Sequence, residues 1–465
     1  MSVISDIPAA SEGLLAAVGR LADAYLATRP SSVVVPPHDD ASLSRRIDDL
    51  LQAAPRPAAE VAAELFELLA DGVVRTDSPR YFGLFNPPAL PEGAAGDLIA
   101  AAVNPQLAVW SHAPAAAAIE ARLVRLFGEL AGWPSDQRAG TFTTGGTEAN
   151  HTAVLAALAR RYPDWGRRGV AGLRKPPALF VSSEAHLAWI KIARAAGLGS
   201  EAVRLVTPAD GLRLTGEGMR QAIAAAPEVD PLLIVGTAGA TSHGAVDDLA
   251  GLADAARAQQ AWFHVDAAWA GATLLLPEHR NLLAGVELAD SLTIDPHKAL
   301  CAPMGTGLYL ARDWAPLAAA FEVSTGYMPP RSDEQRDPYL HSLQWSRRFI
   351  GLRVFTILAM GGLDAAAARL RHQFAMGDRL RSGLAADGWR IVNATALPLV
   401  CVRPEPSDAA AVQRVVASVA RSGRAWVSEA RVAGSPAVRA CVTSYETTPE
   451  DDDELIALLA KGRAG

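Results

Sequence analysis

Apolar runs of strand length alternate with helical patterns through the middle of the chain, and this alternation restricts the possible folds more than any other feature. "AGTFTTGG" precedes the helical "TEANHTAVLAALARRY", "PALFVSSEAH" precedes "LAWIKIARAAGL", and "PLLIVGTAGAT" precedes "DLAGLADAARAQQ". "AWFHVDAAW", "DSLTIDPHK" and "GTGLYLAR" are further apolar runs at strand length. Strands that alternate with helices predict an α/β domain with a mainly parallel sheet and helices on both faces. Ligands of such sheets bind at the carboxyl ends of the strands.

The two ends of the chain depart from this pattern, so we predict three parts. Residues 1–75 are expected to form a helical extension, and residues 76–350 form the large α/β domain. Residues 351–465 are expected to hold a long linking helix and a small α+β domain, in which "PLVCVRPE" and "PAVRACVTSY" are strands. The acidic first turn of "TPEDDDELIALLAKG" is typical of a helix, here the terminal one.

Composition and charge exclude several classes of partner. The 465 residues carry a net charge of -7, which argues against nucleic acid or an anionic membrane as the main partner. No apolar run approaches the roughly 20 residues of a membrane span, and the start of the chain lacks the basic region of a signal peptide. The three cysteines form no CxxC pair, and neither zinc-ligand spacing nor HExxH occurs. We therefore expect a cytoplasmic protein without a metal site.

A glycine-rich turn at residues 143–154, "TTGGTEANHTAV", is the first candidate for a binding site. It places Gly145, Gly146 and Thr147 where a strand passes into a helix, so backbone N–H groups are exposed at the helix N-terminus. Such groups form an anion seat suited to a phosphate monoester. The spacing fits neither a P-loop nor a dinucleotide-binding fingerprint. The alternative is an ordinary glycine turn in which Thr147 caps the helix.

Two polar residues follow predicted strands in the same domain. Asp266, in "HVDAAWAG", ends an apolar strand, where a carboxylate is costly unless it is paired. It could hold a protonated ring nitrogen, or it could simply cap the next element. His186, in "SSEAHLAW", lies just beyond another strand. A histidine there could stack on a ring, although a lone histidine is more often a structural hydrogen-bonding residue.

Lys298 is the most informative of the four lysines in the chain. It lies in "DPHKAL" at the end of an apolar run, where burial favours the neutral, nucleophilic amine that Schiff-base chemistry requires. The alternative is a lysine whose stem packs while its head reaches water. Lys175, Lys191 and Lys461 fit that alternative better, because they lie in a loop, on an amphipathic helix and in the tail.

The order of these motifs indicates one cofactor. A phosphate turn, a strand-end histidine, a strand-end aspartate and a strand-end lysine supply a phosphate seat, a ring stacker, a carboxylate for a pyridinium nitrogen and a Schiff-base amine. Together they match pyridoxal 5'-phosphate.

On these residues the chain resembles the pyridoxal-phosphate-dependent group II amino-acid decarboxylases, from about residue 60 to the C-terminus. "HVDAAWAG" and "DPHKAL" are the most specific pieces, and "TTGGTEAN" and "SSEAH" support them. The resemblance implies the type I pyridoxal-phosphate fold, which is aspartate-aminotransferase-like, with a mixed seven-stranded sheet and a small C-terminal domain. It also implies an N-terminal extension that takes part in a homodimer, with active sites at the interface.

The resemblance also implies roles for ten residues. Lys298 forms the Schiff base, Asp266 pairs with the pyridine nitrogen, Ala268 packs under the ring and His186 stacks on the other face. The phosphate is held by Gly145, Gly146 and Thr147 with His297 nearby, and Thr241 lies beside the ring hydroxyl. Tyr327, in "EVSTGYMPP", corresponds to a tyrosine on a mobile loop that reaches the partner's site and protonates the product carbanion. The alternative for Tyr327 is a plain surface tyrosine.

The implied reaction converts an L-amino acid into an amine and CO2, and the substrate is less clear than the reaction. Phe85 and Trp110 suit an aromatic substrate, which we slightly favour, whereas Asn86 and His112 suit a polar or acidic one. The alternatives are an acidic or diamino acid decarboxylase, an aldehyde synthase, an aminotransferase or a carbon–sulfur lyase. A homologue that lacks the cofactor and acts through protein interactions is a third possibility. Glu446 departs from the family, which commonly has arginine there.

Overall fold

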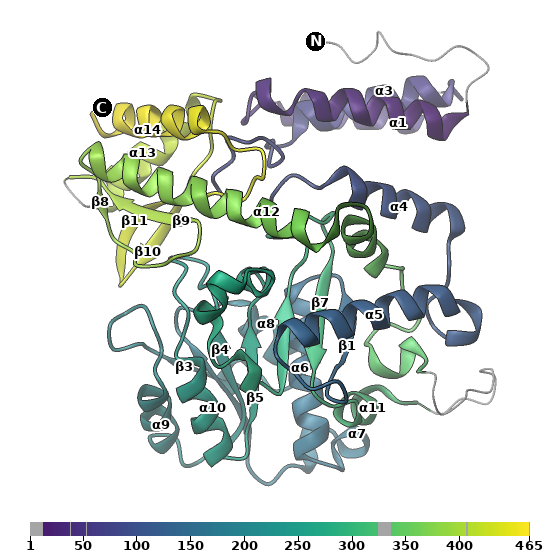
Figure 1. Cartoon of the computed structure of the whole chain (residues 1–465), viewed down its shortest axis with the longest axis vertical. Helices are drawn as coiled ribbons and strands as arrows, with labels where there is room; N and C mark the ends of the chain where they lie inside the picture. The colour runs from purple at the N-terminus through teal and green to yellow at the C-terminus, as the bar shows by residue number, and fades with distance from the viewer. Residues whose placement is uncertain (1–12, 38, 53, 324–335, 406–407, 465) are drawn as a thin grey trace.

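The computed structural model describes residues 13–464 except 38, 53, 324–335 and 406–407 (Figure 1). A seven-stranded sheet forms its centre, in the order β1-β7-β6-β5-β4-β2-β3. The strands are β1 (Ala139–Thr143), β2 (Pro177–Ser182), β3 (Val203–Val206), β4 (Asp230–Thr237), β5 (Trp262–Asp266), β6 (Ser291–Ile294) and β7 (Gly307–Ala311). β7 runs antiparallel to both of its neighbours, and the other neighbouring pairs are parallel. The mixed sheet and the fold class expected from the sequence are therefore confirmed.

Helices cover both faces of this sheet, because its strands present apolar side chains on both sides. The helices are α5 (Pro114–Leu130), α6 (Gly146–Arg161), α7 (Trp165–Arg168), α8 (Ala188–Ala195), α9 (Gly216–Ala224), α10 (Leu249–Ala258) and α11 (Ala315–Phe321). Leu233 and Val235 of β4 pack with α6 and α8, whereas Ile234 between them packs with α10. Successive side chains of a strand point to opposite faces, so α6 and α10 lie on opposite sides of the sheet.

Short 3-10 helices occur between the helices and strands along the chain. They are η2 (Arg29–Ser31), η3 (Trp110–His112), η4 (Val170–Gly172), η5 (Ser200–Ala202), η6 (Ala270–Leu275), η7 (Pro277–Leu283), η8 (Val286–Leu288) and η9 (Pro338–His341).

A second, smaller sheet lies at the C-terminal end of the chain. It is antiparallel in the order β10-β11-β9-β8 and packs with α13 and α14 around a core of its own. Its elements are β8 (Arg390–Ile391), β9 (Leu399–Arg403), α13 (Ala409–Arg421), β10 (Ser428–Val432), β11 (Ser435–Cys441) and α14 (Pro449–Ala464). β9, β11 and α14 were predicted from the sequence. β8 and β10 were not predicted. β8 has only two residues, and three of the five residues of β10 lie outside the core.

The long helix α12 (Gly351–Ala386) leads from the large sheet to the small one (Figure 1). By length and composition alone it could cross a membrane, contrary to the sequence-based expectation, but the core helix of a globular protein gives the same signal. Its backbone leaves helical geometry at Gly362, where φ is 76°. It also packs against α5, α14 and α4 (Pro91–Val103), which is how a core helix behaves.

The N-terminal helices are α1 (Leu14–Ala27), α2 (Asp40–Gln52) and α3 (Ala58–Gly72). α1 and α3 lie side by side, away from the large sheet (Figure 1). The division of the chain into domains at residues 75 and 350 stays a prediction.

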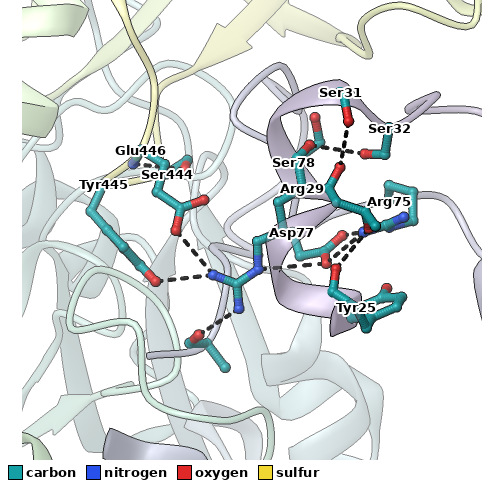
Figure 2. A network of polar contacts seen from close by, with 12 residues as sticks. Tyr25, Arg29, Ser31, Ser32, Arg75, Asp77, Ser78, Ser444, Tyr445 and Glu446 are labelled. Carbon is teal, nitrogen blue, oxygen red and sulfur yellow. Dashed lines mark hydrogen bonds and ion pairs between the residues drawn. The ribbon is translucent and has the colours of Figure 1, made fainter. Parts of the chain in front are cut away.

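One buried arginine joins this N-terminal part to the C-terminal part. The guanidinium of Arg29 donates to the Tyr445 hydroxyl, to Glu446 Oε1 and to the carbonyl of Ala89, each at 3.1 Å (Figure 2). Arg29 also lies 3.8 Å from Asp77. Glu446, the departure noted in the sequence, therefore has a structural partner of opposite charge.

Candidate active site

A cavity of about 390 Å³ lies at the carboxyl ends of β2, β4, β5 and β6, next to the N-terminus of α6. All of the predicted site residues that the structure describes line it: Gly145, Gly146, Thr147, His186, Thr241, Asp266, Ala268, His297 and Lys298. Tyr327 lies outside the described residues. The cavity is where a parallel sheet is expected to bind a ligand. The geometry thus brings the predicted residues together, while their individual roles stay predictions.

The N-terminus of α6 forms one end of this cavity. Gly145 is the N-cap, with φ 152° and no side-chain cap, so Thr147 does not cap the helix as the alternative supposed. Within the described part of the chain, the amides of Gly146 and Thr147 have no hydrogen-bond partner. A Cβ at Gly146 would lie 2.9 Å from Asp295 Oδ2, so only glycine leaves this space open. Free amides at a helix N-terminus bind anions, in agreement with the phosphate seat.

Asp266 is the last residue of β5 and is held by two hydrogen bonds. Its Oδ2 accepts from Asn150 Nδ2 at 2.8 Å, and its Oδ1 accepts from the amide of Ala268 at 3.2 Å. Only 8% of the residue is exposed. Donated hydrogen bonds stabilise the charged form of a buried carboxylate. Asp266 can therefore face a protonated ring nitrogen.

Lys298 reaches the same cavity from the loop after β6. Its Nζ lies 3.0 Å from Asp295 Oδ2 and 5.8 Å from the centre of the Phe85 ring. The surroundings of this amine are therefore not purely apolar, because a carboxylate lies beside it. Sequence reasoning missed Asp295. Its position directly after β6 and three residues before Lys298 is the signal that could have found it.

Two histidines lie on the walls of the cavity. His186 is exposed, and its Nδ1 accepts a hydrogen bond from the amide of Ala188 at the start of α8. His297 is largely buried, and burial lowers its pKa. Its Nδ1 lies 2.7 Å from the carbonyl of Thr306, so the neutral ring donates there, and its Nε2 lies 3.8 Å from Asp295 Oδ2.

Arg439 of β11 is buried behind Thr241, close to the cavity. Its Nε donates to the carbonyl of Thr241 at 2.8 Å, and its Nη1 donates to the carbonyl of Gly83. Its Nη2 has no hydrogen-bond partner among the described residues. The guanidinium lies 4.7 Å from the ring of Phe85, and that ring stacks on Trp269 at 4.2 Å. Arg439 itself is buried and does not line the cavity, so this cation lies behind the aromatic wall formed by Phe85 and Trp269.

These features fit pyridoxal phosphate. The open space beside Gly146 and the free amides of α6 suit a phosphate, and Asp266 suits the ring nitrogen. Two buried oxygens at the cavity, Asp295 Oδ1 and Thr237 Oγ1, have no hydrogen-bond partner among the described residues, as expected of a site built around a polar ligand. Lys298 supplies the amine that would bind the cofactor aldehyde.

Comparison with known proteins agrees with this geometry. A model of the pyridoxal-dependent decarboxylase conserved domain matches residues 41–404. The chain belongs to the pyridoxal-dependent decarboxylase family. It is 34% identical to the cysteine sulfinic acid decarboxylase of Mus musculus over 309 residues, which cover 65% of this chain and 62% of that one. It is 36% identical to the L-2,4-diaminobutyrate decarboxylase of Rhizobium meliloti over 344 residues, which cover 69% of this chain and 64% of that one.

A solved structure extends the likeness to nearly the whole fold. The crystal structure of Oryza sativa TDC with PLP and tryptamine superposes with a TM-score of 0.89, at 26% identity, over 97% of each chain. The matches to the mouse and Rhizobium relatives span less than two thirds of their lengths. The family, the fold and the cofactor are thus those expected from the sequence.

Two residues considered for the substrate lie elsewhere. His112, in η3, is exposed and does not line the cavity of its own chain. Trp110 lines a separate cavity of about 300 Å³ instead. Phe85 does line the cofactor cavity, as the aromatic interpretation expects.

Proposed function

We propose that this decarboxylase converts an L-amino acid into the corresponding amine and CO2. The observation that carries the proposal is the convergence of Lys298, Asp266 and the N-terminus of α6 on one cavity. An amine, a carboxylate for the ring nitrogen and a phosphate seat are the groups that hold pyridoxal phosphate. When bound, this cofactor supplies the electron sink that accepts the electron pair left by the departing CO2.

The residues of the chain supply binding, orientation and proton transfer. Asp266 is proposed to hold a proton on the ring nitrogen, and the two hydrogen bonds that its carboxylate accepts, from Asn150 and Ala268, position it to do so. Asp295, at 3.0 Å from Lys298 Nζ, can accept a proton from the ammonium and so free the amine for bond formation. The stacked Phe85 and Trp269 exclude water beside the reacting carboxylate. Tyr327 is proposed to return a proton to Cα.

Arg439 is proposed to bind the α-carboxylate of the substrate. Its free Nη2 and its place behind Thr241 suit this role, because an arginine binds a carboxylate through directed, charge-assisted hydrogen bonds. An aminotransferase uses an arginine in the same way, so this residue does not separate the two reactions. Membership of the decarboxylase family favours loss of CO2.

An aromatic side chain is the substrate feature that we slightly favour. The basic residues among the described lining of the cavity are His186, His297 and Lys298, and each already has a proposed task at the cofactor. They leave no cation for an acidic side chain, whereas Phe85 and Trp269 offer a stacking surface. The alternative is an acidic or diamino acid, which the names of the mouse and Rhizobium relatives favour.

The active form is proposed to be a homodimer. Exposed apolar side chains gather on the N-terminal helices and on α4: Leu14, Leu15, Leu65, Leu69, Leu98, Ile99 and Val103. Apolar patches of this kind are typical of protein–protein interfaces. Tyr327 and His112 would then act at the partner's cavity. A cytoplasmic location is proposed as well, in keeping with three buried cysteines that form no disulfide in the described chain.

The test is to incubate the cofactor-loaded protein with aromatic, acidic and basic L-amino acids and to read the product masses. A product lighter by one CO2 identifies decarboxylation and the substrate class. A keto acid, or an aldehyde with ammonia and peroxide, would refute the reaction but not the cofactor. Sedimentation of the same sample tests the dimer, which a monomer mass at working concentration would refute.

A further inference from the structure

A continuous chain of buried hydrogen bonds leads away from Asp266 into the sheet. Asn150 Nδ2 donates to Asp266, and Asn150 Oδ1 lies 3.0 Å from His264 Nε2. His264 Nδ1 lies 2.7 Å from the hydroxyl of Ser291, which is also 2.7 Å from Trp262 Nε1. All five residues are buried. The chain thus runs from the carboxyl end of β5 to its beginning.

The two ends of this chain fix the direction of every hydrogen bond in it. The indole N–H of Trp262 can only donate, and an ionised Asp266 can only accept. Trp262 therefore donates to Ser291, and a neutral His264 that carries its proton on Nε2 leaves Nδ1 to accept the hydrogen of Ser291. Asn150 uses its amide N–H on Asp266, so its oxygen must accept from His264 Nε2. Each donor then meets one acceptor, and the orientation of Asn150 follows from the network.

This arrangement requires a neutral His264 with its proton on Nε2. Burial lowers the pKa of His264 to about 4, so the ring is neutral at physiological pH. Thr293 Oγ1, at 3.4 Å, is a second and longer neighbour of Nε2. The ring also packs edge-on against Trp189 at 5.7 Å, which holds its plane. A single tautomer therefore satisfies both ring nitrogens.

The strand pattern explains how these residues meet. Trp262, His264 and Asp266 alternate along β5, so their side chains share the face that packs under α6, which carries Asn150. Ser291 of β6 is the register partner of His264. A polar histidine between Trp262 and Asp266 on a fully buried strand is the sequence signal of this network, because a buried polar group needs a partner.

We propose that Trp262, Ser291, His264 and Asn150 form a positioning chain that orients the Asp266 carboxylate toward the ring nitrogen of the cofactor. Asn150 and His264 are positioning residues, since they act through Asp266. His264 does not line the cavity, and Asn150, which does line it, uses its side-chain amide on Asp266 and His264. The chain holds Asp266 Oδ2, while the amide of Ala268 holds Oδ1, so the carboxylate has one preferred plane. This inference rests on the proposed cofactor-dependent function and adds residues to it.

The experiment compares holoenzymes of the wild type, Ser291→Ala and Asn150→Leu, with Ser291→Thr as the rescue variant and Thr356→Val as the control. Thr356 is equally buried, but its hydroxyl bonds only to carbonyls of its own helix, at Leu352 and Arg353. The readouts are the visible absorbance band of the bound cofactor, which reports protonation of its ring, the rate of cofactor release, and kcat.

We expect the band to shift and the cofactor to leave faster in Ser291→Ala and Asn150→Leu. We expect kcat to fall about 10- to 100-fold, the range found when an outer partner of a functional ligand is removed. Ser291→Thr keeps the hydroxyl and should restore the band, and Thr356→Val should match the wild type.

Unshifted bands in both variants would overturn the inference. So would a shift in Asn150→Leu with none in Ser291→Ala, because the chain beyond Asn150 would then be purely structural. If Asn150→Leu fails to fold, Ser291→Ala decides alone, since it removes one hydroxyl. A wild-type protein with no cofactor band would overturn the proposed function, and this inference with it.

Discussion

Lys298 Nζ and Asp295 Oδ2 lie 3.0 Å apart, inside the motif that carries the Schiff-base lysine. The carboxylate holds the ammonium in place and lies where it can accept the proton that the amine must lose before it bonds to the cofactor. We predict that Asp295→Asn slows attachment of the cofactor, because the amide cannot accept a proton from the ammonium. Stopped-flow absorbance of apoenzyme mixed with cofactor, measured across pH, checks this. An unchanged or faster attachment in Asp295→Asn would reject Asp295 as the proton acceptor.

Lys298 itself should be indispensable for covalent binding. Lys298→Ala is expected to abolish the cofactor adduct that borohydride reduction fixes on the protein, and to abolish turnover. Lys191→Ala is the matched control, because Lys191 is exposed on α8. Intact-protein mass spectrometry after reduction reads the result. A reducible adduct that persists in Lys298→Ala would contradict the assignment of Lys298 as the Schiff-base lysine.

Gly146 is predicted to be essential for the phosphate seat. A methyl group at this position would lie 2.9 Å from Asp295 Oδ2 and 3.4 Å from the Cβ of Ala268. Overpacking of this kind costs about 1–3 kcal/mol, so Gly146→Ala should weaken cofactor binding about tenfold. Gly166→Ala is the control, since nothing lies within 4 Å of a Cβ there. Equilibrium titration of both apoenzymes with cofactor compares them, and equal affinities would contradict the assigned seat.

Arg439 should matter for substrate rather than for cofactor. Arg439→Lys keeps the charge but loses the planar fork, and a hydrogen bond to a charged group contributes about 1.5–3 kcal/mol. We therefore expect kcat/KM to fall about 10- to 100-fold, mainly through KM, with normal cofactor content. The control is Arg403→Lys, because Arg403 donates to backbone carbonyls of Val432 and Pro436 instead. An unchanged KM in Arg439→Lys would reject carboxylate binding by this residue.

The sequence predicted the large sheet and the cavity well because the signals are local. β5 and β6 are buried along their length, and a charged residue that ends such a strand, such as Asp266, stands out in the sequence. The same reasoning missed β3, because this short edge strand, "VRLV", is only buried at its two ends. It also could not pair Arg29 with Glu446, which lie 417 positions apart. Periodicity carries no information about such distant side-chain contacts.

The partners of the catalytic groups were missed for a related reason. Asn150 lies inside the phosphate motif and Asp295 inside the lysine motif, but the sequence indicated no function for either residue. Their roles depend on distances of 2.8 Å to Asp266 and 3.0 Å to Lys298, which only the packing of α6 on the sheet and the turn after β6 determine. Tertiary packing therefore supplied what spacing in the sequence could not.

Asp452, in the first turn of α14, should make stability depend on pH. It is fully buried, neither carboxylate oxygen has a hydrogen-bond partner among the described residues, and burial raises its pKa from 3.8 to about 7. The folded state therefore keeps a proton that the unfolded state loses first. The contribution of the protonated Asp452 carboxyl to the free energy of unfolding is complete below 3.8, the pKa of this group in the unfolded chain. It is lost as the pH rises through about 7, the pKa in the folded protein.

We predict that Asp452→Asn removes this loss, so the stability of the wild type falls relative to the variant as pH rises across that window. Asp453→Asn is the control on the same helix, because Asp453 forms an exposed ion pair with Arg379 at 2.9 Å. Urea unfolding of the three holoproteins at several pH values measures the difference. If the wild type and Asp452→Asn differ in free energy of unfolding by the same amount at every pH, the pKa of Asp452 does not change on folding.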